Sequence, residues 1–64
     1  MKLSSIYKKI FTKVGDIRLI LANCIDLYDE GEPENHLLHE AIDHLQHVEC
    51  ITKMLSLSAK NKEE

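Results

Sequence analysis

The side chains with the most evident chemistry in this 64-residue chain are its four histidines, which lie within twelve positions in the segment HLLHEAIDHLQH, residues 36–47. Imidazole and carboxylate groups one helical turn apart can hold Zn²⁺ or Ni²⁺. Glu40 with His44 and Asp43 with His47 are such pairs, and a partner chain could add a third ligand. The spacing matches neither HExxH nor the Glu-x-x-His of di-iron bundles. We therefore expect no cofactor, and a metal-linked oligomer is our third hypothesis for function.

A helical projection at 100° per residue separates the four histidines. His36 and His47 share one polar stripe with both carboxylates. His44 falls at the edge of the apolar face, and His39 points elsewhere. Most polar stripes of this kind are simply the solvated or interfacial side of an amphipathic helix. The thiol of Cys50 and the thioether of Met54 lie beside this polar stripe. We therefore predict a protein-binding surface composed of His36, His47, Cys50 and Met54.

Two long helices must carry these residues. In the first half, apolar side chains fill successive heptad a and d positions: Leu3, Tyr7, Ile10, Val14, Ile17, Leu21, Cys24 and Tyr28. Further apolar residues make this stripe wider than a two-stranded seam needs: Ile6, Phe11, Ile20, Ile25 and Leu27. The pattern predicts one helix over about residues 4–30, capped by Ser4 or Ser5 and followed by Gly31. A break at Gly15-Asp16, giving three helices, is the alternative.

The second half predicts a helix over about residues 33–58, because Pro33 suits a first helical turn. Its expected core face has Ile42 and Ile51 at the edges and contains Leu37, Leu38, Ala41, Leu45, Val48, Thr52 and Leu55. We expect the charged tail, residues 60–64, to be disordered. The short connection predicts a single all-α domain, an antiparallel helical hairpin.

Length and charge together predict a homodimer. A chain this short buries only about 60% of the surface that it exposes when unfolded, so a second chain would add needed core. The basic residues lie at the chain-terminal end of the hairpin: Lys2, Lys8, Lys9, Lys13, Arg18, Lys53, Lys60 and Lys62. Most acids lie toward the loop: Asp26, Asp29, Glu30, Glu32, Glu34, Glu40 and Asp43. Head-to-tail packing into a four-helix bundle brings these opposite charges together.

The remaining signals exclude several function classes. Cys24 and Cys50 have no CxxC spacing and indicate reduced, structural thiols in the cytoplasm. Lysines interrupt any signal-like apolar stretch, and no apolar run reaches the roughly 20 residues of a membrane span, so we expect no membrane partner. No nucleophile has a nearby base. We therefore predict a cytoplasmic, non-enzymatic adaptor or regulator that binds another protein.

The alternative function is nucleic-acid binding. The first fourteen residues form a basic amphipathic segment, and the candidate contacts to phosphates are Lys8, Lys9, Lys13 and Arg18. In length and expected layout the chain resembles the plasmid-encoded Rop regulator, a hairpin that dimerises into a bundle, and the small helical-hairpin co-chaperones of secretion systems. The resemblance is one of layout alone, with no shared motif, so it assigns no family and no functional residue; a Rop-like RNA-binding regulator is the alternative function.

Overall fold

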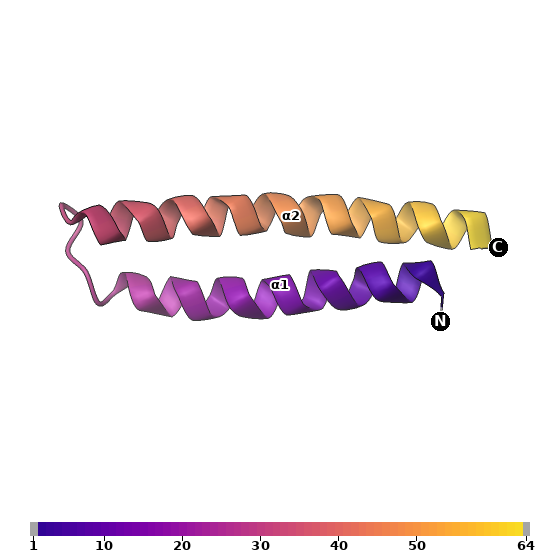
Figure 1. Cartoon of the computed structure of the whole chain (residues 1–64), viewed down its shortest axis with the longest axis horizontal. Helices are drawn as coiled ribbons and strands as arrows, with labels where there is room; N and C mark the ends of the chain where they lie inside the picture. The colour runs from indigo at the N-terminus through magenta and orange to yellow at the C-terminus, as the bar shows by residue number, and fades with distance from the viewer. Residues whose placement is uncertain (1, 64) are drawn as a thin grey trace.

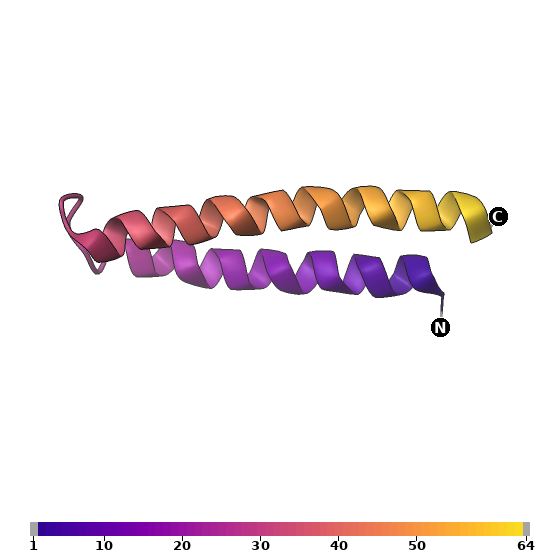
Figure 2. The same cartoon turned by 45° about the horizontal axis from the view of Figure 1, so that its top comes forward.

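The structure, a computed structural model, describes residues 2–63, which form two antiparallel helices joined by one connection (Figure 1). α1 spans Leu3–Ile25 and α2 spans Pro33–Glu63. The two helices lie side by side in both views, with the two chain ends together at the end opposite the loop (Figure 2). The hairpin is 50 Å long. The predicted all-α hairpin is therefore confirmed.

α1 is one continuous helix across Gly15, so the three-helix alternative is wrong. Its N-terminus is not capped by its own serines as predicted: Lys2 occupies the N-cap position, with no side-chain cap. Instead, the carboxylate of Glu63 accepts hydrogen bonds from the Ser4 amide at 3.1 Å and from the Ser4 hydroxyl at 2.6 Å. These bonds, the hydroxyl first, lower the pKa of Glu63 below its ordinary value. The end of α2 thus satisfies a free amide of α1.

α1 ends at Ile25, which is earlier than the predicted end near residue 30. The amides of Leu27 and Tyr28 each donate to a carbonyl three residues back, at 3.1 Å, and so tighten the last turn. Residues 26–32 then connect the two helices, whose axes lie roughly 8–10 Å apart when packed. The buried Asn35 fixes this crossing, because its side-chain amide donates to the Tyr28 carbonyl at 3.3 Å.

α2 begins at Pro33, as predicted, with Glu34 in its first turn at the positive end of the helix dipole. It does not end near residue 58. Residues 60–63 continue the helix, so the disordered tail that we predicted is wrong for them, and residue 64 lies outside the described part of the chain. Lys60 and Lys62 in the last turn favour this extension, because cations stabilise the carbonyl end of a helix.

The two helices meet along a seam with three- and four-residue spacing. Its residues are buried or half-buried: Ser4, Tyr7, Phe11, Val14, Arg18, Leu21 and Ile25 from α1, and Asn35, Leu38, Ile42, Leu45, Glu49, Thr52, Ser56 and Ala59 from α2. Among the described residues, Ala59 is the one apolar side chain in the buried class, beside the buried Asn35 and Thr52. The seam is therefore thin and partly polar.

The seam differs in register from the predicted core. It shares Tyr7, Val14 and Leu21 with the expected a and d row but is otherwise rotated by one residue. The expected core residues that remain exposed are Leu3, Ile10, Ile17, Tyr28, Leu37, Val48 and Leu55, together with Ile51 at the predicted edge.

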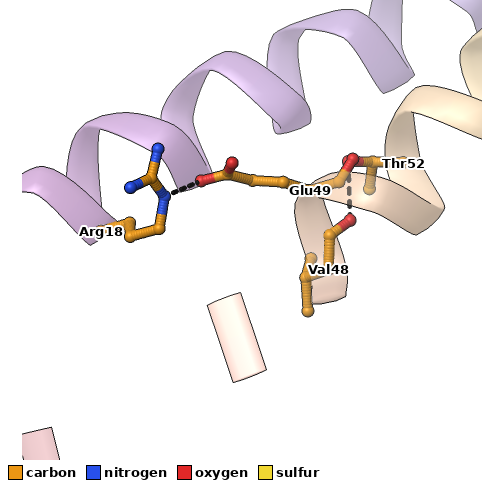
Figure 3. A network of polar contacts seen from close by, with 4 residues as sticks. All are labelled: Arg18, Val48, Glu49 and Thr52. Carbon is orange, nitrogen blue, oxygen red and sulfur yellow. Dashed lines mark hydrogen bonds and ion pairs between the residues drawn. The ribbon is translucent and has the colours of Figure 1, made fainter. Parts of the chain in front are cut away.

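Polar partners across the seam explain the shift in register. The Arg18 guanidinium donates from Nε to Oε1 of Glu49 at 2.6 Å (Figure 3). The Ser56 hydroxyl donates across the seam to the Ser4 carbonyl at 3.2 Å. The Thr52 hydroxyl donates within α2, to the Val48 carbonyl at 2.8 Å. Among residues 2–63, no buried side-chain nitrogen or oxygen atom lacks a hydrogen-bond partner, which makes the polar seam tolerable.

Candidate protein-binding surfaces

One side of the hairpin is covered by large apolar side chains from both helices, and we call this the apolar face. Its members are between 36% and 75% exposed: Leu3, Ile6, Ile10, Ile17 and Ile20 from α1, Leu27 from the connection, and Leu37, Val48, Ile51 and Leu55 from α2. On α1 they follow the spacing of the seam, displaced by one residue toward the N-terminus. The apolar face is thus the remainder of a stripe too wide for one partner helix.

Both rows of the apolar face lie on the same side of the hairpin. Near the chain ends, Leu3 of α1 and Leu55 of α2 line one groove of about 110 Å³. Near the loop, Leu27 and Leu37 line another groove of about 360 Å³, with the half-buried Cys24 between them. The apolar face therefore runs along the hairpin from the chain ends to the loop.

The exposed area is large for a chain of this mass. The accessible surface is 5063 Å² at 7.4 kDa, whereas a compact monomer of that mass exposes about 4200 Å². The excess of about 850 Å² is close to the roughly 800 Å² that each partner contributes to a standard protein–protein interface. This excess belongs to the whole elongated hairpin, of which the apolar face is a part.

The surface predicted from the sequence borders the apolar face. His36, His47, Cys50 and Met54 are all exposed on the outer side of α2, with Met54 at 63%, and His47 and Met54 are one turn from Ile51. They lie on one helix alone. Their role in protein binding stays a prediction.

The candidate metal ligands are not gathered into a site. Within residues 2–63, no group of three or more histidine, cysteine, aspartate and glutamate side chains is placed to hold a metal ion. His44 is exposed and lies in the outer row of the apolar face, seven residues from both Leu37 and Ile51. Glu40, Asp43 and His47 are exposed along α2.

The four candidate phosphate contacts are separated by the fold. Arg18 points into the seam, where its side chain is 27% exposed and paired with Glu49. Lys8, Lys9 and Lys13 instead border a shallow depression on α1. The arginine is thus engaged inside the hairpin, and the lysines form a separate basic surface.

Within the described range, neither helix is both long and apolar enough to cross a bilayer. Comparison with known protein families, with curated proteins and with solved structures finds no match.

Proposed function

We propose that this chain is a non-enzymatic adaptor or regulator that acts by protein–protein binding, and that its first partner is a second copy of itself. The observation that carries the proposal is the apolar face, in which large aliphatic side chains from both helices stay exposed on one side. Contiguous apolar surface of this extent is typical of an interaction site. The two free cysteines support a reducing, cytoplasmic location.

A second copy fits the apolar face because the face can pair with itself. A twofold axis through the middle of the hairpin, near Ile17 and Val48, would lay one apolar face on the other and close a four-helix bundle. Each chain would then bury about the excess area of roughly 850 Å² noted above. Four helices around one core would also give the thin seam apolar neighbours on one side.

Charge favours the head-to-tail orientation of the two copies. The loop half of the hairpin carries acids from Asp26 to Asp43 and no lysine or arginine, whereas the lysines lie toward the chain ends. In a head-to-tail dimer the acidic loop of each copy lies beside the basic end of the other. A dimer with both loops at one end would bring like charges together, which is unfavourable.

Sedimentation equilibrium tests the dimer, which should show twice the mass of 7.4 kDa. Orientation is tested by spin labels on Glu30→Cys in the loop, in a chain whose Cys24 and Cys50 are replaced by serine. Head-to-tail packing predicts a separation near the 50 Å length of the hairpin, whereas loops at the same end would give a separation near its 15 Å width. A monomer at all concentrations contradicts the dimer, and a short label distance contradicts its orientation.

A further inference from the structure

The side of the hairpin opposite the apolar face contains a cleft between the helices near the chain ends, which we call the basic cleft. It encloses about 310 Å³ and is lined by Lys8 and Phe11 of α1 and by Lys53, Ser56, Leu57 and Lys60 of α2. On both helices its residues lie on the flank of the seam away from the apolar face. The basic cleft would therefore stay accessible when the apolar face is covered.

The basic cleft combines cations with an apolar floor. Lys53 and Lys60 are two turns apart on α2, and Lys8 faces them from α1; all three are exposed. No carboxylate is among the residues that line the cleft. Phe11 is half-buried and Leu57 is 56% exposed, so an apolar surface lies between the lysines. The matching ligand carries negative charge around an apolar group.

The basic cleft continues into neighbouring polar surface. A second groove of about 200 Å³ is lined by Lys8 and Lys60 together with the hydroxyl-bearing residues Ser4, Ser5 and Ser56. The Ser4 and Ser56 hydroxyls already donate to the Glu63 carboxylate and to the Ser4 carbonyl, so Ser5 is the hydroxyl that can donate to a ligand carboxylate while the lysines balance its charge. The cleft is thus long enough to follow more than one residue of an extended or helical segment.

We propose that the basic cleft binds an acidic segment of a partner protein. One apolar side chain of that segment lies between Phe11 and Leu57, and its flanking carboxylates meet the three lysines. This inference rests on the adaptor function proposed above and names the chemistry of the client. It does not depend on dimerisation, since the apolar face lies on the other side.

An acidic peptide fits the basic cleft better than a nucleic acid does. Single-stranded nucleic acids gain affinity from stacking bases on aromatic rings, and the exposed apolar residue here is the aliphatic Leu57. A long polyanion would also run toward the loop half, whose acids would repel it. A short acidic segment contacts only the basic end and avoids this repulsion.

Fluorescence anisotropy tests the proposal with a labelled peptide of aspartates and glutamates around one central leucine. We expect saturable binding that weakens when the leucine is replaced by serine. Lys53→Glu should weaken binding about tenfold, because it removes one attraction and adds one repulsion of order 0.5–1 kcal/mol each. Leu57→Ala should weaken it about fivefold through lost apolar contact. Circular dichroism confirms that each variant is helical.

Matched variants distinguish the basic cleft from general charge attraction. Lys9→Glu makes the same charge change on the outer side of α1, and Leu19→Ala makes the same truncation at a residue that is 57% exposed outside the cleft. Both should bind the peptide like the wild type. Equal losses in Lys9→Glu and Lys53→Glu would overturn the proposal. So would tighter binding of oligouridylate, or of phosphatidylserine vesicles, than of the peptide.

Sedimentation in the same buffer separates this proposal from the dimer. Peptide binding by a monomeric protein would support the basic cleft and contradict self-association. A dimer that fails to bind the acidic peptide would contradict the basic cleft and leave the apolar face as the interface between copies.

Discussion

Replacement of Ile17 by aspartate tests the dimer at its proposed centre. Ile17 lies in the apolar face beside Arg18, which pairs with Glu49 near the middle of α2, and it is 50% exposed, so the hairpin itself depends little on the exposed half of its side chain. In the head-to-tail dimer, each copy would bring this residue close to the twofold axis. The substitution should therefore weaken association far more than it weakens the single hairpin.

The magnitude follows from the exposed half of the side chain. Complete burial of an isoleucine contributes about 1.5–3 kcal/mol, so burial of the exposed half of Ile17 contributes about 1 kcal/mol in each copy. Both copies carry the substitution, so this loss occurs twice in each dimer. Removing each aspartate from water costs about 1–3 kcal/mol more. The total of at least about 4 kcal/mol raises the dissociation constant by a factor of about 1,000 or more.

Sedimentation velocity over a dilution series measures this shift, and Leu19→Asp is the matched control. Leu19 lies on the same helix at 57% exposure but on the other side of the hairpin, so its variant has the same added charge and a similar loss of helix propensity. The control should remain a dimer. Our reasoning is refuted if Ile17→Asp sediments like the wild type, or if both variants dissociate equally.

Three further predictions concern the hairpin itself. Gly15→Ala should raise the free energy of unfolding in urea by about 0.5–1 kcal/mol, because alanine favours the helix and its Cβ would meet the carboxylate of Glu49 at an ordinary 3.6 Å; a loss would contradict this. Glu49→Ala should cost about 1–3 kcal/mol by leaving Arg18 half-buried without its partner, whereas replacing both residues by leucine should recover that loss in the same urea assay. Ser4→Ala should raise the pKa of Glu63 toward its ordinary 4.5 in an NMR titration. The cap that Glu63 provides should be complete above that value and be lost as the pH falls below it, and an unchanged pKa in the variant would exclude the bond from the Ser4 hydroxyl.

The two helices could be predicted from the sequence because the apolar spacing is long and regular. The unbroken heptad phase across Gly15 indicated one helix, and Pro33 marked the start of the second. The ends were harder to predict. Gly31 was expected to follow α1 directly, but the chain leaves the helix at Ile25 and crosses over seven residues, 26–32, and no breaker within α1 marks that point.

The register of the seam could not be predicted because α1 has two adjacent rows that could pack against α2. Heptad counting favours the more apolar row through Ile10 and Ile17. The structure uses the row through Phe11 and Arg18, whose polar member is satisfied only once Glu49 of α2 lies opposite. A partner that is 31 residues away in sequence cannot be read from the periodicity of one helix.

The same limit, that contacts between distant residues cannot be read from one helix, applies to the surfaces of the hairpin. The sequence indicated that α1 needed more than one neighbour, and the apolar face agrees with this. It did not indicate the basic cleft, because Lys53 and Lys60 of α2 meet Lys8 of α1 only across the folded hairpin. The seven-residue spacing of Lys53 and Lys60 is the only sign of the cleft in the sequence, and by itself it places these lysines only at the basic end of the hairpin.

The polar seam has a consequence for how much of the protein is folded in a cell. The side-chain bonds between the two helices are those of Ser4, Ser56 and the Arg18–Glu49 ion pair, so in the dimer that we propose, assembly would add to the folding free energy of each hairpin. Each tenfold rise in chain concentration then adds about 1.4 kcal/mol per dimer to the assembled state. Below the dissociation constant each hairpin would lose this contribution and open to proteases more often. In the proposed dimer, chain concentration would therefore set both the assembled fraction and the lifetime of the chain.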